Sequence, residues 1–306
     1  ATTGLDRLAG AGSFVYASPK QRLKPVPVGN NKHVHLLITP GAITEADYYS
    51  EMYMSKRLEY LAEFDHVVGA LVVEIEDDQL YHQRHVQADE DGSFIDLGTM
   101  YKPDGSTRKE RPISLWPGDW HTGSTCPMVR ACVKHMTKKL KPENFFLNDF
   151  FDGTSVNPHI RDNMVELSRT YETNNWNLEK ELIETTKEIE SIQSWGDHKI
   201  YIVYSNHDDF LSRYLTSARY AFRDQAGNHR MGLKLALPHL DGANPIEYFA
   251  KEIYKMKNSE NCIFLKDNDD LRLAGILHSA HGHMGPNGSK ATSCAALEKV
   301  YNIANL

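Results

Sequence analysis

The chain has 306 residues, of which 41% are hydrophobic and 25% charged, so it can form a packed core and is not a disordered chain. A net charge of -7 excludes a protein that coats nucleic acid through bulk positive charge, although bound metal ions would reverse the sign of a local acidic pocket. No apolar run approaches the ~18 residues of a membrane span, and no secretory leader is visible at Ala1. The four cysteines are too dispersed for a disulfide framework, so we expect reduced thiols and a cytoplasmic location.

The first part of the chain, residues 1–112, carries no catalytic motif that we can identify. Its opening stretch, up to about residue 25, is rich in glycine and proline and predicts an irregular lead-in. The expected elements after it are a strand at 33–39, a helix at 45–64, a strand at 67–75, a hairpin joining 80–87 to 93–97, and a charged linker at 102–112. We therefore expect a small N-terminal α/β accessory domain that binds a partner or forms a homo-oligomer.

The second part of the chain, residues 113–306, alternates apolar strands with helices. Strands are predicted at 113–116, 145–147, 200–204 and 271–277, and helices at 125–140 and across 160–195 with a break near Asn174. Each of these strands runs into a loop that carries Asp, Asn or His. Because the carboxyl ends of the strands are where an α/β sheet assembles a site, we expect these loops to meet.

Together the loops offer oxygen and nitrogen ligands but no thiolate. The residues concerned are Asp119 and His121, Asp149 and Asp152, Asn206, His207 and Asp208, and His278, His281 and His283. Such mixed donors suit Mn²⁺, Fe, Zn²⁺ or Mg²⁺. Each loop by itself has an ordinary structural explanation, such as a turn or a helix cap. Four of them in this order, each after a strand, favour a shared metal site.

Taken in order, the motifs Asp-x-His, Asp-x-x-Asp-Gly, Asn-His-Asp and His-Gly-His resemble those of the calcineurin-like metallophosphoesterase superfamily. The resemblance runs from Ser114 to the end of the chain. It implies an α/β (α+β) fold in which helices flank a β-sandwich. It also implies a hydrolase of phosphate esters with two divalent metal ions, Mn²⁺ first and Mg²⁺, Fe or Zn²⁺ as alternatives.

The same resemblance implies a role for each motif residue. The metal ligands would be Asp119, His121, a bridging Asp149, Asn206 and a histidine of the last loop, with His281 ahead of His283 and His278 third. His207 would contact the scissile phosphate or its leaving oxygen, and Asp208 would orient His207.

The chain departs from the family pattern at two places. Asn148 and Ser205 stand where the family usually has glycine, and Gly285 stands where the last histidine of a closing Gly-His-x-His motif would fall. Residues 281–289 resemble the penultimate motif of a phage-encoded branch of the family. We therefore expect the closing motif to lie beyond Leu306, in a longer protein that would act in the host cytoplasm.

The likeness to the phage branch suggests DNA as the substrate, as in nucleases that degrade host DNA early in infection. His159 and Arg161 follow the second motif and are candidates for binding a phosphate. The helix at 125–140 could follow a polyanion, although a solvated surface explains its basic residues equally well: Arg130, Lys134, His135, Lys138, Lys139 and, just beyond it, Lys141.

The leading expectation is thus a metal-dependent phosphodiesterase that acts as a phage DNA nuclease. The alternatives are a phosphomonoesterase for nucleotides or proteins, and a nucleic-acid-binding or regulatory module whose phosphoesterase site has degenerated.

Overall fold

The protein mixes helices and sheets, which confirms the α/β fold class. The computed structural model describes residue 9 and residues 12–26, 35–48, 56–77, 80–160, 163–217, 226–267 and 269–281. The chain divides into two compact units, Ala1–Glu110 and Arg111–Leu306. Within the described ranges, no helix combines the length and the apolar character that crossing a bilayer requires.

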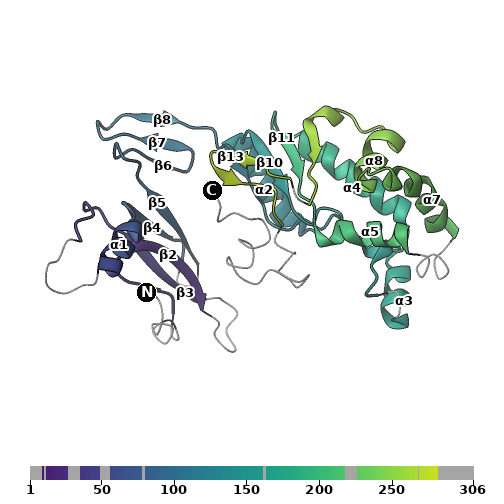
Figure 1. Cartoon of the computed structure of the whole chain (residues 1–306), viewed down its shortest axis with the longest axis horizontal. Coiled ribbons are helices and arrows are strands. Elements are labelled where there is room, and N and C mark those ends of the chain that lie inside the picture. Colours follow the sequence, from purple (N-terminus) through teal and green to yellow (C-terminus); the bar gives the residue numbers. More distant parts are fainter. Residues whose placement is uncertain are drawn as a thin grey trace. The chain divides into compact units, whose positions relative to one another are not determined.

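The first unit is built mainly from β-strands (Figure 1). One sheet has the order β1-β3-β2, in which β3 is parallel to β1 and antiparallel to β2. A second sheet pairs β4 with β5, and a third is the antiparallel meander β6-β7-β8. The elements are β1 (Phe14–Val15), β2 (Ser18–Val26), β3 (His35–Gly41), α1 (Lys56–Asp65), β4 (Gly69–Ile75), β5 (Tyr81–Gln87), β6 (Phe94–Asp96), β7 (Thr99–Tyr101) and β8 (Thr107–Lys109).

Several expectations for this unit are wrong. The glycine- and proline-rich opening contains β2, which tolerates its prolines because it is an edge strand with a register shift between Ser18 and Gln21, around Pro19. The expected linker at 102–112 contains β8. The expected hairpin forms only next to its turn, where the Asp89 amide donates to the Ser93 carbonyl and Ala88 and Phe94 make one antiparallel bridge. Beyond that bridge, β5 pairs with β4 and β6 with β7. Helix α1 begins at Lys56, and residues 45–48 are not helical.

The second unit is organised around a parallel sheet with the order β12-β11-β10-β9. Its strands are β9 (Ser114–Leu115), β10 (Asn144–Leu147), β11 (Lys199–Ile202) and β12 (Cys262–Phe264). Because each neighbouring pair is parallel, all the carboxyl ends lie at the same edge. All of β10 is buried, as expected for a central strand covered on both faces.

Helices cover one face of this sheet. Phe145, Leu147 and Ile200 point into the main core, where Leu182 and Ile189 of α4 pack against them. Figure 1 shows α4, α7 and α8 grouped on that side. The helical elements are α2 (Pro127–Leu140), η2 (Thr154–Val156), α3 (Met164–Glu172), α4 (Leu178–Gln193), α5 (Asn206–Thr216), α7 (Ala226–Leu240), α8 (Pro245–Tyr248), a π-helical turn η3 (Phe249–Ile253) and η4 (Ser259–Asn261).

A small hairpin contributes to the core on the other face. Phe146 stacks between Trp116 and Tyr201, with ring centroids 4.7 and 4.9 Å apart, and Leu273 of the hairpin packs against this cluster. The hairpin, β13 (Arg272–Leu273) and β14 (Ile276–Leu277), replaces the single strand expected at 271–277. Its turn residues, Ala274 and Gly275, both have positive φ, as a tight two-residue hairpin turn requires. The family-type β-sandwich stays a prediction.

Candidate metal centre

The loops after β9 and β10 continue the strand pairing beyond the sheet. The amides of Trp120, His121 and Thr122 donate in turn to the carbonyls of residues 148, 149 and 150, at 2.9, 2.9 and 3.1 Å. His121 and Asp149 have φ of 47° and 43°, a left-handed conformation that costs a non-glycine residue about 1–3 kcal/mol. The hydrogen bonds between the loops hold both residues in this conformation, so the two side chains converge.

Asp149 lies at the centre of the converging side chains. Its carboxylate is buried, and Oδ2 lies 3.3 Å from His281 Nε2 and 3.9 Å from His121 Nε2. Its other oxygen, Oδ1, is buried and has no hydrogen-bond partner among the described residues. Leaving a buried carboxylate oxygen unpaired is costly. A bound cation would remove that cost, so the residues present fit a metal site.

Two groups of possible ligands share Asp149. One group is His121, Asp149 and His207, and the other is Asp119, Asp149 and His281; within each group the ligand atoms lie within 4.8 Å of one another. An amide oxygen joins the second group, because Asn206 Oδ1 lies 3.2 Å from His281 Nε2. The resemblance implied that Asp119 and His121 hold the same metal, whereas here they fall in different groups.

Asp152 contacts both histidines of the first group. Its Oδ1 lies 3.1 Å from His121 Nδ1, a charge contact rather than an aligned hydrogen bond. Its backbone carbonyl lies 2.5 Å from His207 Nδ1. Because a carbonyl can only accept, Nδ1 of His207 carries the proton and Nε2 keeps its lone pair. Sequence reasoning named Asp152 among the possible ligand donors, from its position in Asp-x-x-Asp-Gly, but did not predict its contacts with the two histidines.

Asp208 does not orient His207, which corrects one implied role. Its Oδ2 accepts from the Ser205 amide at 2.7 Å and the Ser205 hydroxyl at 3.0 Å, and this capping box begins α5. Burial raises the pKa of the Asp208 carboxyl to about 7, and the negative charge of Asp149 adds to the effect. Ser205, at a family glycine position, is thus the helix cap that places His207 in the first turn of α5.

The third-choice ligand, His278, has a structural role. Its Nδ1 lies 2.7 Å from the Ile276 carbonyl and its Nε2 lies 3.0 Å from Ser114 Oγ, so both ring nitrogens are engaged. Its ring packs against Trp116 and Phe146, with centroids 5.8 and 4.9 Å away. His278 therefore joins the hairpin to β9.

The remaining candidates lie at the margin of the site. His283 and Arg161 fall outside the described residues. His159 is exposed, and its ring meets Phe210 edge-on at 5.8 Å; the Phe210 ring lies 4.8 Å from that of His207. The role of His159 in binding substrate stays a prediction.

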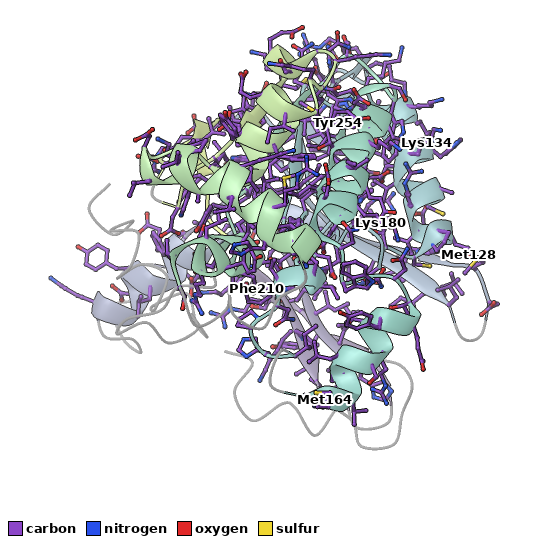
Figure 2. The ribbon with its side chains drawn as sticks, turned by 90° about the vertical axis from the view of Figure 1, so that its right-hand side faces the viewer. Met128, Lys134, Met164, Lys180, Phe210 and Tyr254 are labelled. Carbon is purple, nitrogen blue, oxygen red and sulfur yellow. The ribbon has the colours of Figure 1, made fainter. Side chains whose placement is uncertain are left out.

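The basic helix α2 is less available to a polyanion than its sequence suggests. Arg130 makes a bidentate ion pair with Glu188 at 2.6 and 2.8 Å and lies over the Trp195 ring, so packing within the unit occupies its guanidinium. Figure 2 shows Lys134 on the outer side of α2. Lys138 and Lys139 are exposed in the last turn, where they also complement the helix dipole.

Comparison with known proteins connects the chain to a phage protein. It is 30% identical over 280 residues to Protein A1 of Escherichia phage T5. The match covers 87% of this chain but 49% of Protein A1, so the chain spans about half the length of that relative. No family model matches the chain, and no solved structure matches it.

Proposed function

We propose that this protein is a metal-dependent phosphodiesterase that uses two divalent ions, and that it serves a phage as a DNA nuclease. The observation that carries the proposal is the sharing of Asp149 between two groups of ligand atoms. A carboxylate in that position is a natural bridge between two cations, and such pairs lie about 3.5–4 Å apart in phosphodiester-cleaving sites. Mixed oxygen and imidazole donors favour Mn²⁺.

The residues fall into complementary roles. Asp149 and His121 would hold one ion. Asp149 would also hold the second ion, together with Asp119, Asn206 and His281. Ions bound there would supply a nucleophile at neutral pH and neutralise charge on the phosphate. Asp152 keeps His121 turned towards the centre through its contact with Nδ1.

His207 would supply the proton that the leaving oxygen needs. With Nδ1 donating to the Asp152 carbonyl, Nε2 faces the shared centre beside Asp149 and His121. The ring would first take up a second proton at Nε2, and that proton would pass to the leaving oxygen as water adds to phosphorus and the bond to the leaving oxygen breaks. Imidazole suits this task because its ordinary pKa lies near neutrality.

DNA as the substrate is supported by the relationship to a phage protein and by the two-ion arrangement. The fold alone does not fix a ligand, so the substrate must be tested directly.

The test is hydrolysis of bis-p-nitrophenyl phosphate and of plasmid DNA with Mn²⁺. We expect both to be cleaved by the wild-type protein and neither by Asp149→Asn, whose unfolding temperature without metal should stay close to that of the wild type. Cleavage of the mono-ester p-nitrophenyl phosphate, with neither diester cleaved, would replace the proposal with a phosphomonoesterase. Metal binding without cleavage of any ester would replace it with a binding module that has a degenerate site.

A further inference from the structure

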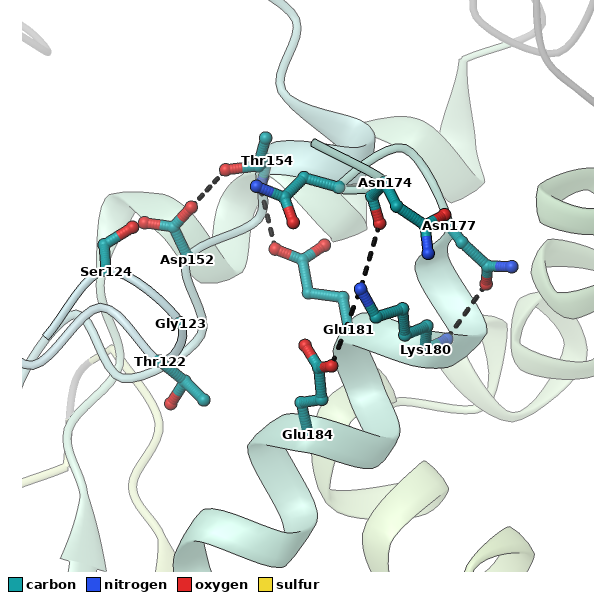
Figure 3. Close-up of a pocket in the computed structure, with 11 residues that line it drawn as sticks. Thr122, Gly123, Ser124, Asp152, Thr154, Asn174, Asn177, Lys180, Glu181 and Glu184 are labelled. Atoms are coloured by element: carbon teal, nitrogen blue, oxygen red, sulfur yellow. Dashed lines mark hydrogen bonds and ion pairs between the residues drawn. The ribbon is translucent and has the colours of Figure 1, made fainter. Parts of the chain in front are cut away.

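A polar cavity opens between the start of α4 and the loop that follows His121. We call it the α4 pocket, and it is lined by Thr122, Gly123, Ser124, Asp152, Thr154, Asn174, Asn175, Asn177, Lys180, Glu181 and Glu184. Figure 3 shows Glu181 reaching from α4 to the backbone amide of Thr154, with Glu184 beside Lys180 on the same helix. The cavity has about 40 Å³ of free volume, room for a few water-sized groups. It can therefore accept the edge of a larger molecule.

The α4 pocket adjoins the metal centre. Asp152 belongs to both, because its carboxylate lines the pocket and lies 3.1 Å from Nδ1 of His121. The loop from Thr122 to Ser124 follows His121 directly and forms one wall. A substrate whose phosphate lies at Asp149 would thus have a neighbouring group within reach of this pocket.

The charges around the α4 pocket exclude a second phosphate. Three acidic residues line it, Asp152, Glu181 and Glu184. Burial raises the pKa of Glu181 to about 7, so at neutral pH the negative charge comes mainly from Asp152 and Glu184, against one ammonium group, that of Lys180. Lys180 already donates to the Asn174 carbonyl at 3.1 Å and lies 3.7 Å from Glu184. An anionic group would meet surplus negative charge, whereas an uncharged group that donates hydrogen bonds would meet acceptors.

The hydrogen-bonding groups at the mouth of the pocket indicate the chemical class of the ligand. Asn174, Asn175 and Glu184 are exposed, so a ligand at the mouth of the pocket can reach them. Among the described residues, the two asparagine side-chain amides have no hydrogen-bond partner in the protein, and the Glu184 carboxylate pairs only with Lys180. Carboxylates accept from the amino group of cytosine, and asparagine amides pair with the edge of adenine. In DNA the sugar oxygens at the 3′ and 5′ positions are esterified, so the base edges are the uncharged groups with donors to offer.

We propose that the α4 pocket binds the edge of a nucleobase that carries an exocyclic amino group, on a nucleotide next to the scissile phosphate. The proposal rests on the phosphodiesterase function and adds base preference to it. Glu184 accepts from the amino group, and the amides of Asn174 and Asn175 pair with the neighbouring ring atoms. Thymine, which presents a carbonyl oxygen in place of the amino group, is disfavoured by the same carboxylate.

The first experiment measures binding without catalysis, so that it does not depend on hydrolysis. Saturation-transfer NMR compares deoxycytidine with thymidine, neither of which has a phosphate. We expect transfer to deoxycytidine in the wild type, at least about fivefold weaker transfer to thymidine, and loss of the deoxycytidine signal in Glu184→Gln. Glu179→Gln is the matched control, because Glu179 is exposed on the same helix and does not line the pocket. Equal transfer to both nucleosides, or a signal unaffected by Glu184→Gln, would overturn the proposal.

The second experiment measures kcat/KM for p-nitrophenyl esters of deoxycytidine and thymidine 5′-monophosphates, with bis-p-nitrophenyl phosphate as a substrate without a base. Glu184→Gln should lower kcat/KM for the deoxycytidine ester by about fivefold or more and leave bis-p-nitrophenyl phosphate unchanged. An equal loss on all three substrates would refute base recognition. A wild-type protein that cleaves none of the esters would refute the phosphodiesterase function. The NMR result alone would then decide whether the α4 pocket binds a nucleobase.

Discussion

Replacement of Asp152 by Asn tests whether this carboxylate supports the metal centre. The Asp152 side chain is 18% exposed, and its Oδ1 lies 3.1 Å from His121 Nδ1, so the contact is largely shielded from water. Loss of a carboxylate that supports a metal-binding histidine commonly lowers metal affinity by about 10- to 100-fold. That range corresponds to roughly 1.4–2.7 kcal/mol of binding free energy.

Asp152→Asn should leave the fold in place. The backbone carbonyl that holds His207 is unchanged, and the amide oxygen of asparagine can still accept from the Thr154 hydroxyl, as the carboxylate does. Titration calorimetry of metal-free protein with Mn²⁺ gives the affinity, and thermal unfolding checks the fold. Asp241→Asn is the control, because Asp241 is exposed and its side chain makes no hydrogen bond or ion pair in the described part of the chain. An Mn²⁺ affinity equal to that of the wild type, with the same unfolding temperature, would refute the supporting role.

Three further predictions follow from other contacts. Gly153 has φ of 70°, and a Cβ there would lie 3.1 Å from the Phe210 ring, so Gly153→Ala should destabilise the protein by about 1–2 kcal/mol, measured by urea unfolding; an unchanged midpoint would contradict this. His207→Ala should slow cleavage of a dinucleotide by about 100-fold or more but affect bis-p-nitrophenyl phosphate much less, because nitrophenolate leaves without a proton; equal losses in kcat would argue against proton donation. Burial raises the pKa of Glu181 from 4.5 to about 7, so the folded state binds the extra proton and metal-free stability should fall as pH rises from about 5 to 8. Glu181→Gln should flatten that slope in urea titrations, and a slope unaffected by the substitution would count against the assignment.

The sequence predicted the strands of the parallel sheet where apolar runs end in polar turns. Strands β9, β10 and β11 are of this kind, and their loops carry Asp119, Asp149 and Asn206 to one edge. Strand β12, which has three residues, was not predicted. The turn within the apolar run at 271–277 was not predicted. Ala274 adopts the left-handed conformation there, and alanine is not one of the residues that favour turns.

The site could be predicted in its donor types but not in its internal contacts. The family resemblance implied that Asp149 and His281 serve one metal site, and the structure brings Asp149 Oδ2 to 3.3 Å from His281 Nε2. Either Asp208 or Asp152 could have accepted a hydrogen bond from His207, and the outcome depended on which of them took part in the helix cap. Ser205 takes the Asp208 carboxylate, so the nearby carbonyl of Asp152 contacts the imidazole instead. Three-dimensional packing decides between these two partners, so the spacing of the residues in the sequence could not predict which one contacts His207.

The hydrogen bonds from residues 120–122 to residues 148–150 also bear on how the proposed metal centre would release and rebind an ion. These bonds join main-chain atoms and involve no ligand atom, so the backbone under Asp149 and His121 keeps its shape in the empty protein. Chelation should then remove the ion without melting the loops, and rebinding should need no slow refolding. The protein could therefore exchange one divalent ion for another as their concentrations in the cell change.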